Sequence, residues 1–385
     1  MNKPKKIAYL TTAIGFGGSE KVTLNLLRSA GHLKSSIKPF LMVRPWEEKG
    51  TLLQELDKLN IHYQTLPVAA KPPAEGNDYL RIIRCIRLLM THLQAGKYDL
   101  IHTSGYFADI IGIMAARYLG VKVLATCHGF ISNDAKLKFY NNLDIFMLRY
   151  ATRVIAVSSV IMNELVGKHV PKRKIVHIQN AVSANPATEP KACVRKELGV
   201  AESEILIGYC GRLSPEKGLR NLMQALILLK QEPIKCLFIG EGPERGFIEK
   251  YARDMHIQDK VILLGFQENV EKWMTALDIF VLPSFTEGHP MALLEAMACR
   301  VPAICSRVGD IPGIIEDNQS GRLVAPGDVA QLKRAIQEIA ADAEVRQRLS
   351  GNAGKIIEQR FGLSNWIKKM EDIYDSTILK SEWTA

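Results

Sequence analysis

The sequence predicts an α/β protein built from two doubly wound parallel-sheet domains that face a cleft. Three observations predict this fold. Short apolar runs alternate with amphipathic segments of helical length along the whole chain, as in βαβ units. The length of 385 residues suits two domains of ordinary size. A small, polar, proline-bearing run, Ser183–Pro190, divides the chain near its middle and is typical of a linker.

The first half is predicted to form one sheet, within a domain of residues 1–183. Its strand candidates are Ile7–Thr12, Phe40–Val43, Leu100–Thr103, Val121–Thr126, Val154–Val157 and Ile175–Ile178, and helical patterns cover 20–33 and 79–95. The strand runs are short and apolar or β-branched, as parallel strands buried on both faces are.

The second half is predicted to form a second sheet, within a domain of residues 191–362. Its strand candidates are Ile205–Tyr209, Leu237–Ile239, Val261–Leu264, Ile279–Leu282, Ala303–Cys305 and Arg322–Val324, with helical patterns over 218–231, 243–256 and 328–340. Residues 363–385 are expected to form a helix that crosses back to the first domain. In such sheets ligands bind beyond the carboxyl ends of the strands, so the residues after each strand are the first candidates for a site.

Composition excludes several classes of protein. Hydrophobic residues make up 47% and charged residues 23%, which indicates a globular chain and excludes a disordered one. No apolar stretch approaches the ~18 residues that span a bilayer; the best candidate, Phe107–Ala116, is short and carries Asp109. The charged start runs directly into a strand pattern, unlike a signal peptide. Seven cysteines without Cys-x-x-Cys spacing argue against disulfides and structural zinc, and favour the cytoplasm.

The net charge of +10 belongs to one half of the chain. Residues 1–190 hold 25 Lys and Arg against 13 Asp and Glu, whereas residues 191–385 hold 25 against 27. This asymmetry favours an anionic partner for the first half: nucleic acid, an anionic membrane surface or an anionic substrate.

A glycine-rich turn follows the first predicted strand. It reads Gly15-Phe16-Gly17-Gly18-Ser19-Glu20 and opens a helix. Ser19 is expected to cap that helix, and the glycines allow backbone N–H groups to approach a ligand closely. Phosphate or sugar binding and an ordinary strand–helix turn are both open interpretations, because the spacing matches neither Gly-x-Gly-x-x-Gly nor a P-loop.

A second turn places two cations at a helix start. Arg212 and Lys217 lie five residues apart in Gly211-Arg212-Leu213-Ser214-Pro215-Glu216-Lys217-Gly218. An arginine fork and a lysine point charge at a helix N-terminus suit a diphosphate, which needs charge neutralised on both phosphates. The alternative is a solvated turn with an ion pair to Glu216.

A third turn carries two carboxylates. Glu287 lies in the loop after the strand that ends at Leu282, Pro290 is expected at the first helical position, and Glu295 lies about a turn and a half into that helix. Carboxylates at such places recognise vicinal hydroxyls. The alternative is a buried helix with two solvated glutamates, but Glu295 in an apolar run is costly without a partner, which favours a functional role.

These motifs together resemble the retaining glycosyltransferases of family 4, which have the GT-B fold. The resemblance lies in Glu287-x₇-Glu295, the 211–218 turn, Gly240-Glu241-Gly242-Pro243, Leu264-Gly265-Phe266 and Val281-Leu282-Pro283-Ser284. In the first half it lies in Gly17-Gly18-Ser19-Glu20, His128-Gly129 and Ile155-Ala156-Val157-Ser158. The match covers nearly the whole chain, and the second-half motifs occur in the family's order.

The resemblance implies a donor site and a mechanism. Arg212 and Lys217 would hold the donor's diphosphate and stabilise it as it leaves, Glu287 would bind hydroxyls of the transferred sugar, and His128 would line the reacting face. These four are the expected catalytic residues. Transfer would retain the anomeric configuration, with the departing diphosphate helping to deprotonate the acceptor. No Asp-x-Asp metal spacing occurs, and neither a metal nor another cofactor is expected.

The remaining donor contacts are also implied by the resemblance. Glu295 would bind the ribose hydroxyls, and Gly17 and Gly18 would lie close to the diphosphate. Phe266 and Gln267 lie where the nucleobase pocket is expected. The other expected donor-binding residues form one run, in which every residue except the proline would supply a backbone N–H group to the sugar or the β-phosphate: Gly288, His289, Pro290, Met291, Ala292 and Leu293.

Three positions depart from the family's pattern. Asn180-Ala181-Val182-Ser183 stands where Asn-Gly-Val-Asp is common, which puts a hinge contact in doubt. His289 stands where Phe is frequent, and it either reaches a phosphate or an acid group or packs by its ring. Pro312-Gly313 replaces Pro-Glu at a position read as structural.

The basic first half has two open explanations. A helix over 79–94 places Arg81, Arg84 and Arg87 along one side, and residues 136–139 read Lys-Leu-Lys-Phe. This pattern suits docking on an anionic membrane, and it equally suits a solvated arginine face over a core helix. Nucleic acid is disfavoured, because no interleaved aromatic pattern accompanies the cations.

The sequence therefore predicts a cytoplasmic, membrane-peripheral glycosyltransferase that uses a nucleotide sugar, a UDP-sugar in preference, and builds a polysaccharide, lipopolysaccharide or glycolipid. The acceptor would be a glycan or a lipid-linked glycan. The alternatives are a GT-B sugar-nucleotide epimerase, a sugar-phosphate synthase, and a catalytically inactive nucleotide-sugar-binding subunit.

Overall fold

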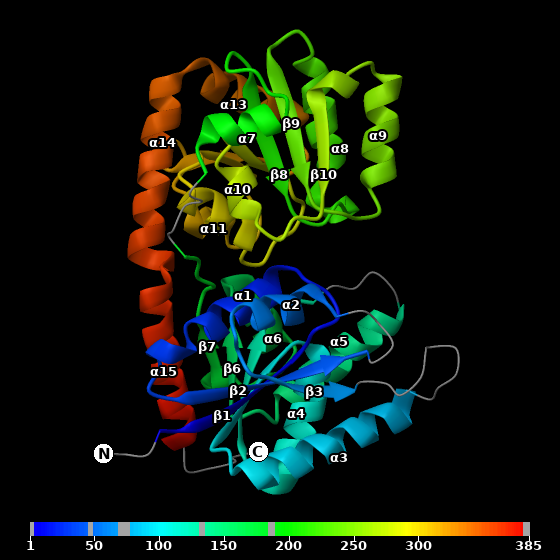
Figure 1. Ribbon diagram of the computed structural model, residues 1–385, viewed down its shortest axis with the longest axis vertical. Coiled ribbons are helices and arrows are strands. Elements are labelled where there is room, and N and C mark those ends of the chain that lie inside the picture. Colours follow the sequence, from blue (N-terminus) through cyan, green and yellow to red (C-terminus); the bar gives the residue numbers. More distant parts are fainter. Residues whose placement is uncertain (1–3, 45–48, 68–77, 131–134, 184–188, 380–385) are drawn as a thin grey trace. The chain divides into compact units, whose positions relative to one another are not determined.

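The chain forms two compact units (Figure 1). The computed structural model describes residues 4–44, 49–67, 78–130, 135–183 and 189–379, and the side chains within them except those of 78–81 and 135–137. Unit 1 comprises residues 1–180 and 363–385, and unit 2 comprises residues 181–362. Most of the predicted linker, residues 184–188, lies outside the described residues.

Unit 1 is built on a parallel seven-stranded sheet in the order β3-β2-β1-β4-β5-β6-β7. Its strands are β1 (Lys6–Thr12), β2 (Ser36–Val43), β3 (Gln64–Pro67), β4 (Leu100–Ser104), β5 (Lys122–Cys127), β6 (Arg153–Ala156) and β7 (Ile175–His177). Residues Ile7–Leu10 of β1 are buried, as expected of a central strand covered on both faces. The strand order reverses between β1 and β4.

Helices cover both faces of this sheet (Figure 1). They are α1 (Gly18–Arg28), α2 (Thr51–Lys58), α3 (Asp78–Gly96), α4 (Tyr106–Leu119), α5 (Ala135–Leu148), α6 (Ser159–Gly167) and α15 (Leu363–Leu379), with short turns η1 (Ala30–His32) and η3 (Lys172–Lys174). Both α4 and α15 contact β4 and β5. The last described helix of the chain therefore completes the unit that the first strand begins.

Unit 2 is built on a parallel six-stranded sheet in the order β10-β9-β8-β11-β12-β13. Its strands are β8 (Ile205–Cys210), β9 (Ile234–Ile239), β10 (Val261–Gly265), β11 (Ile279–Leu282), β12 (Ala303–Ser306) and β13 (Gly321–Val324). Here the strand order reverses between β8 and β11. Ligands of open α/β sheets bind at such reversals, beyond the carboxyl ends of the strands.

The helices of unit 2 also form two layers. They are α7 (Lys191–Glu197), α8 (Leu219–Leu228), α9 (Arg245–Asp254), α10 (Val270–Met274), α11 (Met291–Ala298), α12 (Ile311–Ile314), α13 (Val329–Ala341) and α14 (Ala343–Ile356), with turns η4 (Pro215–Lys217), η5 (Gln258–Lys260) and the π-helical η6 (Ile357–Phe361). Both α11 and α13 contact β11 and β12.

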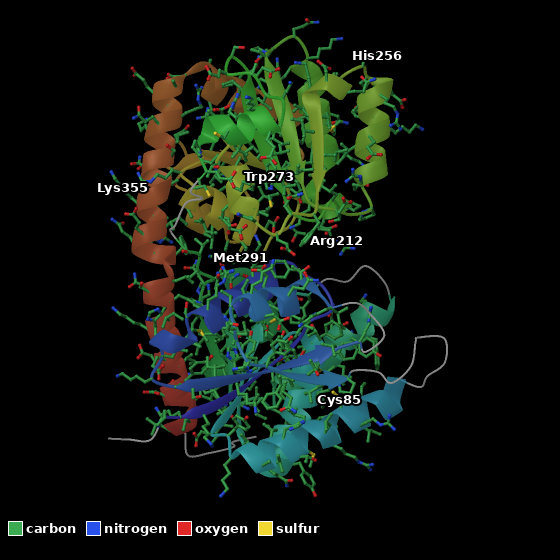
Figure 2. All side chains as sticks on the ribbon, in the orientation of Figure 1. Cys85, Arg212, His256, Trp273, Met291 and Lys355 are labelled. Atoms are coloured by element: carbon green, nitrogen blue, oxygen red, sulfur yellow. The ribbon has the colours of Figure 1, made fainter. Side chains whose placement is uncertain are left out.

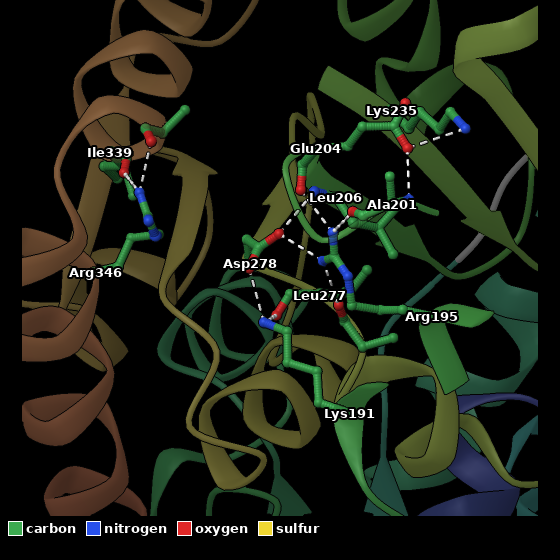
Figure 3. Close-up of polar contacts among 12 residues, drawn as sticks. Lys191, Arg195, Ala201, Glu204, Leu206, Lys235, Leu277, Asp278, Ile339 and Arg346 are labelled. Carbon is green, nitrogen blue, oxygen red and sulfur yellow. Dashed lines mark hydrogen bonds and ion pairs between the residues drawn. The ribbon is translucent and has the colours of Figure 1, made fainter. Parts of the chain in front are cut away.

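An ion-pair network around the buried Arg195 joins α7 to the amino edge of this sheet (Figure 3). The Arg195 Nη1 atom donates to Asp278 Oδ2 at 2.8 Å, and Lys191 Nζ donates to Asp278 Oδ1 at 2.7 Å. The backbone N–H of Leu206 in β8 donates to the same Oδ2 atom at 2.8 Å. Arg195 is buried, and its other nitrogen donates to the carbonyl oxygens of Ala201 and Glu204. One carboxylate thus links α7, β8 and the start of β11.

The predicted α/β class with two parallel sheets is confirmed, and each of the twelve predicted strands overlaps a strand of the structure. The prediction missed β3, a four-residue edge strand that ends at Pro67 and has no apolar run to mark it. The stretch Phe107–Ala116 lies within α4, which is buried along most of its length. Within the described residues, no helix is both long and apolar enough to cross a membrane.

Candidate active site

The carboxyl ends of β8 and β11 bring the predicted donor residues of unit 2 together. Arg212 and Lys217 follow β8, and Glu287 follows β11. Figure 2 shows Arg212 and Met291, the first residue of α11, at the same edge of unit 2. Since β8 and β11 are adjacent in the sheet, the two turns meet at the reversal of strand order.

An ion pair joins the two turns. Lys217 Nζ donates to Glu287 Oε1 at 2.8 Å, and the Glu287 side chain is only 7% exposed. The hydroxyl of Ser284 donates to the same Oε1 atom at 2.7 Å. Among the described residues, no cation forms the alternative ion pair with Glu216, whose carboxylate accepts from Ser214 Oγ at 2.6 Å. The cation therefore pairs with a carboxylate seventy residues away in the chain.

Two glycines allow neighbouring turns to close on this pair. Gly218 has φ +67°, and a Cβ atom there would lie 2.0 Å from the carbonyl oxygen of Pro283. Gly309 has φ +56°, and a Cβ atom there would lie 1.9 Å from the carbonyl oxygen of Glu287. Both backbone conformations favour glycine, and neither contact leaves room for a side chain. The backbone on each side of the Glu287 carboxylate is therefore tightly packed.

Arg212 is the more exposed of the two cations. Among the described residues, none forms a hydrogen bond or an ion pair with its side chain, although its carbonyl oxygen accepts from Tyr209 Oη at 2.8 Å. Burial raises the pKa of Glu216, but the Ser214 bond and the charges of Lys217 and Arg212 outweigh burial and hold that pKa below its usual value. Both cations thus act on one small region, as binding of a diphosphate requires.

The helix after Glu287 begins one residue later than predicted. Pro290 is the N-cap and α11 starts at Met291, so the first N–H groups of the helix come from Met291, Ala292 and Leu293. Glu295 is 3% exposed within this helix. His289 is also buried, and its ring packs against Phe361 at 5.4 Å between centroids. The structure thus shows the ring contact of His289, and its contact with a phosphate or an acid group stays a prediction.

The two residues expected at the base pocket differ in environment. The ring of Phe266 is 45% exposed after β10. Gln267 donates through Nε2 to the Leu264 carbonyl at 3.2 Å and accepts from Trp273 Nε1 at 3.0 Å. Both ends of the Gln267 amide are therefore engaged within unit 2.

Three of the predicted residues lie in unit 1, also at carboxyl ends of strands. Gly17 and Gly18 follow β1, and His128 follows β5. The hydroxyl of Ser104, at the end of β4, lies 3.1 Å from His128 Nε2. Burial lowers the pKa of His128 to about 4, so the imidazole is neutral at physiological pH.

The predicted cap at Ser19 is wrong. Helix α1 begins at Gly18, with Gly17 as N-cap, so Ser19 is already inside the helix. The carboxylate of Glu20 accepts from the Gly17 N–H at 2.9 Å, and the Ser19 hydroxyl donates to that carboxylate at 2.9 Å. A glutamate at the third helical position reaches back to the N-cap as in a capping box. Glu20, and not Ser19, therefore supplies the side-chain acceptor at the start of α1.

A buried polar chain beside His128 was missed from the sequence. His102 Nδ1 lies 2.8 Å from Tyr374 Oη, and His102 Nε2 lies 2.7 Å from Thr126 Oγ1. Burial, with a smaller effect of His128, lowers the pKa of His102 to about 3. Both imidazoles line one pocket with Trp366 of α15. In the sequence, a histidine inside the predicted strand Leu100–Thr103 could have indicated this hydrogen-bonded group. Nothing in the sequence around Tyr374 indicated its part in it.

Comparisons with known proteins match both units. Residues 191–356 match the family model "Glycosyl transferases group 1", and residues 16–185 match "Glycosyltransferase Family 4". The N-acetyl-alpha-D-glucosaminyl L-malate synthase of Bacillus anthracis is 29% identical over 290 residues, which are 73% of this chain and 75% of that protein. An Escherichia coli enzyme, UDP-Gal:alpha-D-GlcNAc-diphosphoundecaprenol alpha-1,3-galactosyltransferase, is 27% identical over 345 residues, or 85% and 87% of the two chains.

A solved structure shares the fold. The crystal structure of Anabaena Alr3699/HepE in complex with UDP and glucose aligns with a TM-score of 0.83 at 21% identity, covering 97% of this chain and 100% of that one. The GT-B fold expected from the sequence is thereby confirmed. The two family matches together cover residues 16–185 and 191–356, which include every strand of both sheets except the first, and the chain belongs to the family 4 glycosyltransferases.

Proposed function

We propose that this protein is a retaining hexosyltransferase that moves a sugar from a UDP-sugar to a hydroxyl of a glycan or lipid-linked acceptor. The observation that carries the proposal is the Lys217–Glu287 pair beside the exposed Arg212, at the strand-order reversal of the group 1 module. The two cations supply the positive charge that a departing diphosphate needs, so the reaction proceeds without a bound metal.

The residues divide between the leaving group and the sugar. Arg212 and Lys217 bind the diphosphate, and the N–H groups at the start of α11 add donors to it. Glu287 binds hydroxyls of the transferred sugar, and Glu295 binds the ribose. The bond from the anomeric carbon to the diphosphate oxygen breaks while the acceptor oxygen bonds on the same face, and the acceptor proton passes to the departing diphosphate.

The remaining predicted residues keep the roles expected of them, each within its own unit. In unit 2, Phe266 and Gln267 would contact the base. In unit 1, Gly17, Gly18 and the neutral His128 would contact the substrates. The relatives support the choice of donor and acceptor. The E. coli relative is named for a UDP-galactose donor and an undecaprenol-linked acceptor, and the Anabaena protein was crystallised with UDP.

A donor panel tests this function. Purified protein is incubated with UDP-glucose, UDP-galactose or UDP-N-acetylglucosamine and an undecaprenyl-diphosphate-linked sugar, with and without EDTA. UDP release and an α-linked product, identified by mass spectrometry and NMR, are expected from at least one donor, unchanged by EDTA and lost in Glu287→Ala. The exposed Glu202→Ala is the matched control in unit 2 and should keep full activity.

Each alternative has its own outcome in that experiment. UDP-sugar binding without turnover would identify a binding subunit and contradict the proposal. A changed sugar configuration on free UDP-sugar would identify an epimerase, and transfer to a sugar phosphate would identify a synthase. A β-linked product would overturn retention alone.

We also propose that unit 1 docks on an anionic membrane surface. Arg84 and Arg87 are exposed on α3, and Lys138 and Phe139 are exposed at the start of α5, with the Phe139 side chain 58% exposed. Both helices pack against α4. Arg81, Lys136 and Leu137, also predicted for this surface, have side chains outside the described set. Cations beside an exposed aromatic ring suit an anionic lipid interface.

Vesicle sedimentation measures this docking. Binding to vesicles with 30% phosphatidylglycerol is expected to exceed binding to pure phosphatidylcholine, and Arg84→Glu/Arg87→Glu should weaken it roughly 30-fold, at about 1 kcal/mol for each lost cation. Lys250→Glu/Arg253→Glu, on the exposed side of α9, is the control for total charge. Equal weakening by the two double variants would mean that net charge, and not this surface, drives binding.

A further inference from the structure

We propose that Ser284 is a positioning residue that determines which oxygen of Glu287 faces the donor sugar, an inference that rests on the proposed function. The Oε1 atom of Glu287 accepts both hydrogen bonds of the site, from Ser284 Oγ at 2.7 Å and from Lys217 Nζ at 2.8 Å. Among the described residues, none donates to Oε2. The carboxylate therefore keeps one oxygen for the protein and one for a ligand.

Ser284 holds that orientation more firmly than Lys217 does. Its side chain is fully buried, two residues beyond the end of β11, and its hydroxyl donates only to this carboxylate within the described part of the chain. Lys217 is a flexible side chain with three donors, and a diphosphate competes with Glu287 for its ammonium group. When Lys217 turns to the diphosphate, the Ser284 bond remains and keeps Oε2 directed at the sugar.

The surrounding backbone also favours control of the Glu287 side chain by Ser284. The contact of Gly309 with the Glu287 carbonyl fixes the main chain, and Asp310 N donates to the Gly288 carbonyl at 3.2 Å. With the main chain fixed, the remaining freedom of Glu287 is rotation of its side chain. A hydrogen bond to an ionised carboxylate is among the stronger ones in proteins, so Ser284 restricts that rotation effectively.

The test is Ser284→Ala, assayed by calorimetry with UDP and with the preferred UDP-sugar, and by steady-state kinetics. UDP lacks the sugar that Glu287 binds, so its affinity should be unchanged. Affinity for the UDP-sugar should fall about tenfold, the size expected for one charge-assisted hydrogen bond. Discrimination between UDP-glucose and UDP-galactose, which differ at one hydroxyl, should shrink by a similar factor.

Two controls keep the result interpretable. Ser320→Ala removes another buried serine hydroxyl of unit 2, which accepts from the Glu316 N–H at 2.9 Å, and it should change neither affinity nor discrimination. Ser284→Cys keeps the volume with a weak donor and should fall between wild type and Ser284→Ala, which covers the case in which alanine misfolds. A positioning role is contradicted if UDP and UDP-sugar lose affinity equally, or if Ser284→Ala and Ser284→Cys match Ser320→Ala.

The proposed function fails by a different result. Wild-type protein that binds a UDP-sugar but never transfers it contradicts the transferase proposal, while the affinity difference between UDP and UDP-sugar still reports on Ser284.

Discussion

Replacing Lys217 by alanine is expected to lower kcat of sugar transfer by about two to three orders of magnitude, the size typical for loss of one preorganised charge-stabilising group. The ammonium group stabilises negative charge that appears only as the diphosphate leaves, so kcat should fall far more than KM rises. Single-turnover kinetics with a saturating UDP-sugar measure the chemical step directly.

The same change also leaves the buried Glu287 carboxylate without its cation, so stability needs a separate measurement. Thermal unfolding of Lys217→Ala shows whether unit 2 remains folded at the assay temperature. Lys250→Ala, which removes an exposed lysine from α9, should leave both kcat and the unfolding temperature unchanged. A folded Lys217→Ala protein with near wild-type kcat would rule out a role for Lys217 in stabilising the leaving group.

Replacing Asp278 by alanine is expected to lower the free energy of unfolding by about 3–5 kcal/mol, because it leaves the buried Arg195 guanidinium without its counter-ion. It also removes the acceptor for the Leu206 N–H and for Lys191, which together tie α7 to the sheet. Urea unfolding at pH 7 measures the change. Asp254→Ala, an exposed carboxylate on α9, should cost less than about 0.5 kcal/mol.

The pH dependence of this effect has a defined sign. Burial raises the pKa of Asp278, but the bonds from Lys191, the Leu206 N–H and Arg195 outweigh burial and hold that pKa below the usual value for an aspartate, 3.8. A lowered native pKa stabilises the fold at neutral pH, and this stabilisation is lost as the pH falls below about 3.8. The difference in the free energy of unfolding between wild type and Asp278→Ala should therefore become smaller in acid. A difference that stays constant from pH 7 to pH 3 would mean that Asp278→Ala lowers stability through lost packing alone.

The sequence predicted the strands and the turns more fully than the contacts between them. Lys217 and Glu287, seventy residues apart, were each placed in the right turn. Their pairing depends on the close approach of Gly218 to the Pro283 carbonyl, between the turns that follow two neighbouring strands. No local pattern encodes such an approach. Ser284 is part of the Val281–Ser284 motif, but no role followed for it from the sequence, because a serine after a strand is common. Only its hydrogen bond to Glu287 sets it apart from other such serines.

Local competition explains the smaller errors. Ser19 and Glu20 both had a side chain suited to capping α1, and the helix start at Gly18 decided between them in favour of the longer side chain. The ring contact of His289 is with Phe361, more than seventy residues later in the chain, so no local pattern could predict it. Both outcomes depend on backbone positions that the sequence defines only to within a residue or two.

The return of α15 to unit 1 has a consequence for biosynthesis. Tyr374 bonds His102, and Glu371 accepts from Ser35 Oγ at 2.9 Å, so unit 1 includes residues that are translated after the whole of unit 2. Unit 2 is continuous in sequence and contains all of its own strands. During translation, unit 2 therefore has all of its strands available for folding before α15 is made. Unit 1, although most of it is synthesised earlier, still lacks at that point the helix that covers β4 and β5.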